Sequence, residues 1–133
     1  MDWLSFRKML YHDLSEVFNL KEMRLIEQDQ SRTVYLMYDG DLAIGMLELA
    51  LRNFVDGCLS SPVAYLEGIY LISEYQRKGL SSLMMDKVKE WSKKKGCSEL
   101  ASDAEIDNYT AQKFHVSAGF EETYRIVEYK MKL

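Results

Sequence analysis

A hydrophobic segment and the turn and helix that follow it constrain the fold of this chain more than any other feature. Residues 63–72 are apolar or aromatic except for Glu67 and Gly68, which is typical of a strand inside a sheet. From Leu80 to Gly96, apolar residues recur at helical spacing, and residues 98–102 form a short second strand. A strand, a helix and a strand in this order cross over and pair in parallel. The apolar positions of the helix are Leu80, Leu83, Met84, Val88 and Trp91.

The preceding part of the chain predicts two helices and an antiparallel pair of strands. Residues 2–10 carry apolar side chains at helical spacing, and Ser15 is placed to cap a second helix. Residues 33–39 alternate and lead through Asp39, Gly40 and Asp41 into a returning strand at 42–51, which predicts a hairpin. The residues expected to face the core from the two helices are Trp3, Phe6, Leu10, Val17, Leu20 and Met23.

The rest of the chain predicts a helix over 108–118, ended by Gly119, and a last strand within 120–133. The fold class is therefore α+β, with a mixed, mostly antiparallel sheet flanked by helices. One proline and the lack of a Ser/Gly/Pro-rich run leave no place for a linker, so we expect a single domain over residues 1–133.

Composition excludes several classes of function. A net charge of −4 argues against a nucleic-acid binder and favours cationic partners. The start of the chain does not resemble a secretory signal, and no run of eighteen apolar residues occurs, so we expect a cytoplasmic protein without a membrane span. The two cysteines and two histidines lie too far apart in sequence to indicate a metal site, and free thiols fit a reducing compartment.

The turn between the long strand and the helix is a candidate anion site. Gly79 allows a tight turn, and the first amides of a helix have no partner within it. Arg77 and Lys78 add two cations, which suits a pyrophosphate. Taken alone, this pattern favours an ordinary solvated turn over an anion site.

A longer pattern resembles the GNAT acetyltransferases. The run Gln76-Arg77-Lys78-Gly79-Leu80-Ser81 is similar to the family's Q/R-x-x-G-x-G/A signature, and Asn108, Ala111, His115 and Gly119-Phe120 are similar to its later N-x-x-A and G-F segment. The resemblance implies that acetyl-CoA is the cosubstrate. The cofactor-binding residues that it implies are Ile69, Tyr70, Leu71, Gln76, Arg77, Lys78, Gly79, Leu80, Ser81, Asn108 and Ala111.

Further runs resemble the aminoglycoside 6'-N-acetyltransferases of this superfamily. They are residues 66–70, 95–103 and 119–123, with residues 60–63 upstream. The chain departs from that group at several positions: Tyr11 stands where a tryptophan is usual, Tyr124 stands where several members carry glutamate, and the loop at residues 53–56 is one residue short. We also expect no counterpart of the family's first strand, since the sequence opens on a helix. The resemblance implies transfer of an acetyl group to the 6'-amine of an aminoglycoside, hence antibiotic resistance, and a homodimer.

The chemistry of acyl transfer indicates Glu67 as a candidate base, and the resemblance implies catalytic roles for Asp103 and His115. A carboxylate can attract an ammonium group and accept its proton. Glu67 interrupts an apolar strand, where an acid is rarely buried without a partner or a function. Alternatively, Glu67 pairs with a lysine or faces solvent, and Asp103 caps a turn. His115 is a candidate donor to the departing thiolate, although it can equally be a packing residue, and Tyr109 competes for the role.

The acceptor site is expected to include Tyr11, Phe54, Glu67, Asp103 and Tyr124. Backbone amides of residues 69–71 would polarise the thioester carbonyl if the strand is splayed, and Gly68 permits a bulge there. Two alternative functions stay open: a GNAT enzyme acting on another amine, such as a polyamine, a small metabolite or a protein N-terminus, and a CoA-binding module with weak catalysis.

Overall fold

The computed structural model describes residues 2–133 and divides them into two compact units. The first ends at Asp103, and the second spans Ala104–Leu133. The first unit contains α1 (Asp2–Leu10), α2 (Glu16–Gln28), β1 (Arg32–Asp39), β2 (Leu42–Arg52), β3 (Val63–Leu71), the short 3-10 turn η1 (Ser73–Tyr75), α3 (Leu80–Lys94) and β4 (Leu100–Ser102). The second contains α4 (Tyr109–Ala118). Whether the whole chain forms a single domain stays a prediction.

The four strands form one mixed sheet in the order β1-β2-β3-β4. The first three pair antiparallel and β4 pairs parallel with β3, so the predicted hairpin, crossover and mixed α+β class are confirmed. Gly40, at a φ of 60°, forms the tight turn of the hairpin. The two helices α1 and α2 precede the first strand, β1.

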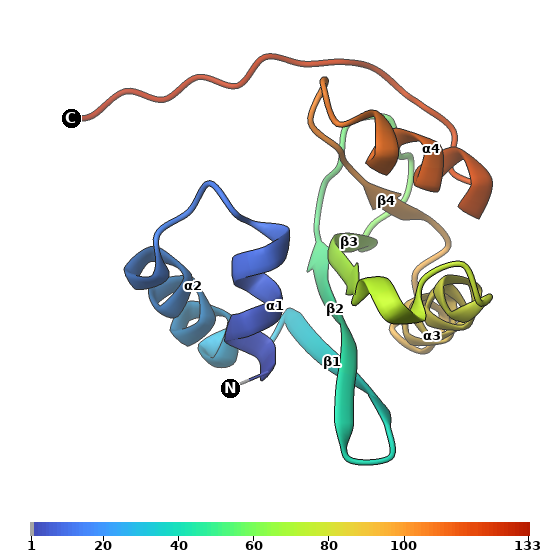
Figure 1. Ribbon diagram of the computed structural model, residues 1–133. Coiled ribbons are helices and arrows are strands. Elements are labelled where there is room, and N and C mark those ends of the chain that lie inside the picture. Colours follow the sequence, from blue (N-terminus) through green and yellow to red (C-terminus); the bar gives the residue numbers. More distant parts are fainter. Residues whose placement is uncertain (1) are drawn as a thin grey trace. The chain divides into compact units, whose positions relative to one another are not determined.

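Helices pack on both faces of this sheet (Figure 1). Met46 of β2 packs with Phe6 of α1, whereas a side chain at its neighbour Gly45 would meet Met84 of α3. Successive residues of a strand point to opposite faces, so α1 and α3 cover opposite sides. Ser15 caps α2, as expected, by accepting a hydrogen bond from the amide of Phe18.

Three expectations about the elements were wrong. Leu83 on α3 is 55% exposed and Val17 on α2 is 76% exposed, because the buried faces run through Met84, Met85 and Val88 and through Asn19 and Met23 instead. Residues 120–133 form no strand within the described chain. Their alternating pattern suits a strand, but a strand exists only where a second one supplies hydrogen bonds, and this segment stays exposed.

Candidate active site

The first predicted catalytic carboxylate, Glu67, lies at a bulge in β3. Glu48 of β2 is opposite Gly68 and the next residue, Leu49, is opposite Leu66, so Glu67 is the extra residue of the bulge. The expectation that Gly68 permits a bulge is confirmed. The bulge turns the Glu67 side chain to a partly exposed position, with 19% of its surface accessible.

The carboxylate of Glu67 is held by Arg52, at the end of β2. Nη2 of Arg52 lies 3.0 Å from each carboxylate oxygen, and its Nε lies 3.3 Å from Oε2. The Arg52 guanidinium also stacks on Tyr65, with Cζ 3.4 Å from the ring centroid. Glu67 therefore has a cationic partner, as the alternative interpretation expected, but the partner is an arginine instead of a lysine.

The second predicted carboxylate, Asp103, joins the same cluster through Tyr65. The Tyr65 hydroxyl donates a hydrogen bond of 2.5 Å to Oδ2 of Asp103, which directly follows β4. Burial, and then the hydrogen bond to Asp103, raise the pKa of Tyr65 well above its usual range, so the phenol remains a donor. The structure thus brings Glu67 and Asp103 into one cluster with Arg52 and Tyr65, named below the acceptor cluster.

Tyr11, in the turn that follows α1, contacts the backbone of the bulge in β3. Its hydroxyl lies 3.3 Å from the backbone oxygen of Glu67 and 3.0 Å from Oε1 of Glu48. Burial and the nearby Glu48 carboxylate raise the pKa of Tyr11 far above its usual range. Tyr11 therefore acts as a neutral donor that ties α1 to the strand carrying Glu67.

Beneath Tyr11 lies a buried network of charged groups. Glu48 is 1% exposed and Arg7 2%, and Nη1 of Arg7 contacts both Glu48 oxygens at 2.7 and 2.6 Å. The indole of Trp3 donates to Glu48 at 2.7 Å, and Nε of Arg7 donates to Asn19 at 3.0 Å. Both buried charges of this network, Arg7 and Glu48, thus have partners, which the low polarity of a core requires.

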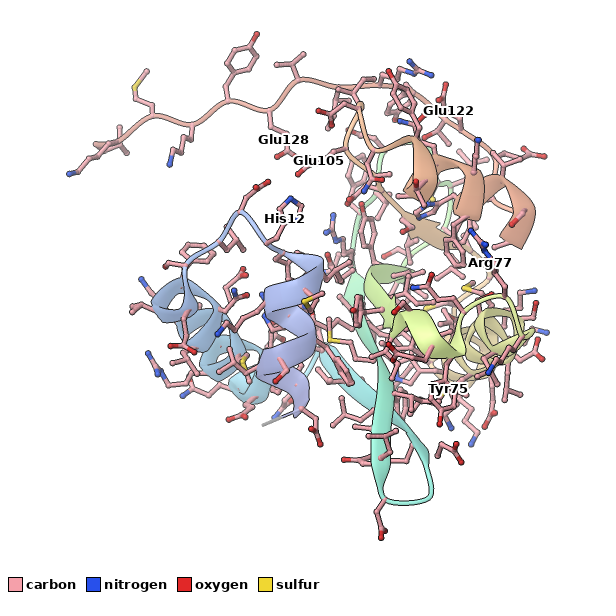
Figure 2. All side chains as sticks on the ribbon, viewed as in Figure 1. His12, Tyr75, Arg77, Glu105, Glu122 and Glu128 are labelled. Atoms are coloured by element: carbon pink, nitrogen blue, oxygen red, sulfur yellow. The ribbon has the colours of Figure 1, made fainter. Side chains whose placement is uncertain are left out.

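The predicted cofactor turn has the geometry of an uncapped helix start. Gly79 is the N-cap residue of α3 with a φ of 81° and no side-chain cap, so amides at the helix start need partners from outside the helix. Arg77 has a φ of 62°, and Figure 2 shows it, with Tyr75, on the segment leading into α3. Gln76 donates its side-chain amide to the carbonyl of Leu71 at 2.8 Å, which fixes the turn to the end of β3.

Strand β3 continues beyond its pairing with β4. β4 pairs with β3 only at residues 64–66, so Ile69, Tyr70 and Leu71 lie beyond the end of that pairing. The backbone of these three residues forms no strand pairing with β4. An extended ligand could add to this edge as a strand does.

The second unit holds the predicted site residues that lie on α4 and near its two ends. Asn108 caps α4 by accepting a hydrogen bond from the amide of Ala111. Nδ1 of His115 lies 2.6 Å from the carbonyl of Ala111, and because a carbonyl only accepts, Nδ1 carries the proton. The ring also lies edge-on to Phe114 and Phe120, so the packing alternative for His115 has direct support.

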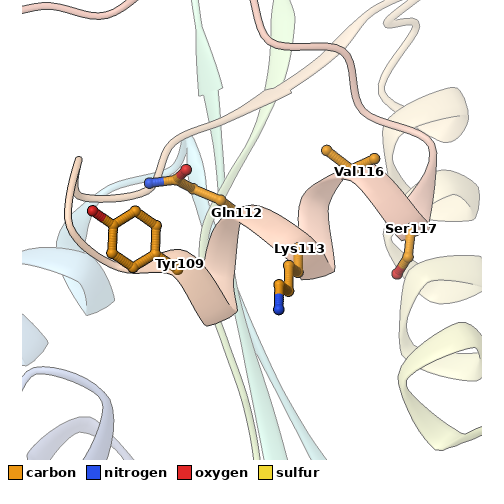
Figure 3. Close-up of a pocket in the computed structure, with 5 residues that line it drawn as sticks. All are labelled: Tyr109, Gln112, Lys113, Val116 and Ser117. Carbon is orange, nitrogen blue, oxygen red and sulfur yellow. The ribbon is translucent and has the colours of Figure 1, made fainter.

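A shallow pocket also lies on α4, lined by Tyr109, Gln112, Lys113, Val116 and Ser117 (Figure 3). It does not include His115. Phe54, in the first unit, is 77% exposed, and Tyr124 is 51% exposed. Their roles toward an acceptor stay predictions.

Sequence reasoning missed Arg52, Tyr65, Arg7 and Glu48. One signal was available: Glu48 is the only acid within the apolar run 42–51, the same argument that singled out Glu67. Arg52 and Tyr65 carry no such signal, because their pairing depends on the register between β2 and β3.

Residues 3–120 match the model of the acetyltransferase (GNAT) family. The aminoglycoside N(6')-acetyltransferase type 1 of Acinetobacter genomosp. 13 is 42% identical over 130 residues, covering 97% of this chain and 89% of that protein.

Two solved structures have the same fold. The aminoglycoside 6'-N-acetyltransferase AAC(6')-IG of Acinetobacter haemolyticus superposes with a TM-score of 0.91 at 36% identity, covering 99% of this chain and 91% of that one. AAC(6')-Iy, in complex with the bisubstrate analog CoA-S-monomethyl-acetylneamine, superposes with a TM-score of 0.88 at 32% identity, covering 98% and 90%. The chain belongs to the acetyltransferase (GNAT) family, and the relatives that it matches over nearly their full length are aminoglycoside 6'-N-acetyltransferases.

Proposed function

We propose that this protein transfers the acetyl group of acetyl-CoA to the 6'-amine of an aminoglycoside antibiotic. The observation that carries the proposal is the acceptor cluster, which joins Glu67 at the β3 bulge to Asp103 after β4. Two carboxylates beside the end of the β3–β4 pairing suit a cationic acceptor. The nearly full-length similarity to aminoglycoside 6'-N-acetyltransferases supports the same substrate class.

In the proposed reaction, Glu67 takes a proton from the acceptor's ammonium group, directly or through a water molecule. Asp103 holds the cationic acceptor in place. Acetyl-CoA supplies an activated acyl group, so the freed amine nitrogen forms a bond to the thioester carbon while the carbon–sulfur bond breaks. The sulfur leaves with the bonding electrons and takes a proton from Tyr109 or from Nε2 of the protonated His115. The nitrogen loses its second proton as the amide forms, and water carries that proton back to the donor.

The residues around α3 fit the cosubstrate. The uncapped amides from Gly79 to Ser81, with Arg77 and Lys78 beside them, suit its pyrophosphate, with Gln76 fixing the turn. The unpaired side of residues 69–71 suits the pantetheine amides, which would be flanked by Asn108 and Ala111. Tyr11, Phe54 and Tyr124 would line the acceptor site.

A homodimer is the proposed assembly. Val127, Tyr129, Met131 and Leu133 alternate with charged residues and are 75% to 109% exposed, so a second copy could bury this face. Truncation after Thr123 should convert a dimer to a monomer in light scattering, whereas a full-length monomer would exclude the assembly. Among the described residues, no helix is long and apolar enough to cross a membrane. We propose a cytoplasmic location because Cys58 and Cys97 are free thiols, which fits a reducing compartment.

Steady-state assays with acetyl-CoA test the function. We expect turnover of kanamycin or tobramycin with a kcat/KM well above that for spermidine or peptide amines. Preferred turnover of another amine would place the enzyme in a different acceptor class, and CoA binding without turnover of any amine would make the protein a binding module.

Variants of the acceptor cluster test the assigned roles. Glu67→Gln and Asp103→Asn should each lower kcat/KM at least tenfold while leaving stabilisation by CoA nearly unchanged. Glu27→Gln, an exposed acid on α2, is the matched control and should leave both unchanged. Wild-type kinetics in both cluster variants would refute the assigned roles.

A further inference from the structure

We propose that Arg52 is a specificity-determining residue that competes with the acceptor's ammonium group for Glu67. This inference rests on the proposed function. The guanidinium holds the Glu67 carboxylate in the structure described here, through Nη2 at 3.0 Å from both oxygens. An acceptor can therefore use Glu67 as anchor and base only after it has displaced Arg52.

The exposure of the pair makes such an exchange feasible. Arg52 keeps 43% of its side-chain surface accessible and Glu67 keeps 19%, so the guanidinium can move into solvent without opening the core. The ion pair between Arg7 and Glu48 on the same strand is the opposite case, with side-chain exposures of 3% and 1%. The Arg7–Glu48 pair is therefore shielded from ligands, whereas the Arg52–Glu67 pair is accessible to them.

The chemistry of the acceptor then decides whether the exchange is favourable. An ammonium group replaces one ion pair on Glu67 by another, whereas a hydroxyl replaces an ion pair by a weaker neutral hydrogen bond. After transfer, the nitrogen is a neutral amide, which competes poorly with the guanidinium. Arg52 thus lowers the affinity for the substrate's ammonium group. Once the product has formed, Arg52 can again form its ion pair with Glu67.

Asp103 offers the acceptor a second contact that Arg52 does not block. It accepts a hydrogen bond from Tyr65, and no Lys or Arg within residues 2–133 forms an ion pair with it. A polycation can therefore bind first at Asp103 and then displace Arg52 from Glu67. Competition from Arg52 should therefore weaken only the contact between Glu67 and the acceptor group that binds it, and not the contact at Asp103.

Arg52→Gln tests this step, with neomycin and paromomycin as probes, because these aminoglycosides differ only in an amine or a hydroxyl at the 6' position. Calorimetry with the CoA-bound protein measures the Kd of both, and kinetics measures the KM of neomycin. We expect a two- to five-fold lower Kd and KM for neomycin, the range of an exposed ion pair, with the Kd for paromomycin nearly unchanged.

Three further variants make the test specific. Arg24→Gln removes the same charge from exposed α2 and should change neither Kd. Arg52→Lys, which keeps a cation without the two-pronged contact, should fall between wild type and Arg52→Gln. In a Glu67→Gln background, Arg52→Gln should have no effect on the Kd for neomycin.

The inference is overturned if Arg52→Gln leaves the Kd for neomycin unchanged or raises it, or shifts both Kd values equally, since an equal shift reports only the lost charge. A lower kcat without a lower KM would instead make Arg52 a residue that positions Glu67. A wild type that acetylates no aminoglycoside refutes the proposed function, yet the two Kd values still decide the role of Arg52.

Discussion

Replacement of Arg7 by methionine should cause a large loss of stability. Arg7 lies in α1 and neutralises Glu48, whose side chain is 1% exposed, through two contacts of 2.7 and 2.6 Å. Methionine fills part of the volume of arginine but supplies no charge. The Glu48 carboxylate would then remain in the core with only the Trp3 and Tyr11 hydrogen bonds.

The magnitude follows from the burial of the pair. Removal of one partner of a buried ion pair costs about 3–5 kcal/mol, because the other charge is left uncompensated. For a chain of this size, that corresponds to a fall in Tm of roughly 10–20 °C. Replacement of both residues by methionine should recover much of the loss, because no buried charge remains.

Urea unfolding of Arg7→Met, Glu48→Met and the double variant measures the coupling between the two residues. Lys8→Met is the matched control, because Lys8 is on the same helix and its ion pair with Glu16 is exposed. We expect a change of at most about 1 kcal/mol for the control. A loss below about 1 kcal/mol for Arg7→Met, or a double variant no more stable than the single ones, would refute the reasoning.

Three other changes test separate parts of the fold. Gly68→Ala should lower stability by about 1–3 kcal/mol in thermal unfolding, because a Cβ there would meet the hydroxyl of Tyr11; a wild-type Tm would contradict this close packing. Ser15→Ala should cost about 1 kcal/mol through loss of the cap of α2, measured by urea unfolding, and no loss would exclude that role. Hydrogen bonds from Ser60 hold the pKa of Glu99 below its usual value, so the stability that the ionised group contributes is present at pH 7 and declines as the pH falls below about 4. Glu99→Gln should therefore lower Tm more at pH 7 than at pH 3, and an equal effect at both would contradict this role.

The parts of the fold that the sequence predicts well are those set by local patterns. The amphipathic helix α3 is bounded by Gly79 and Gly96, both with positive φ, and the hairpin turn at Gly40 is equally local. The bulge at Glu67 was also predictable, because a glycine beside an acid interrupts an apolar strand.

The parts that could not be predicted depend on contacts between distant segments. The pairing of Arg52 with Glu67 and the stacking on Tyr65 follow from strand register, which no local pattern encodes. The strand predicted within residues 120–133 had the right alternation, but its formation requires a pairing partner. Leu83 matched the helical period of α3, yet it lies at the margin of the buried face.

The position of the new acetyl group on the antibiotic tests the central claim most directly. Kanamycin should be incubated with acetyl-CoA and the protein, and the product analysed by NMR, with Glu67→Gln as the comparison. We predict a single product acetylated on the 6' nitrogen, formed far more slowly by the variant. An acetyl group on a different nitrogen, or no acetylated kanamycin from the wild-type protein, would contradict the proposed function.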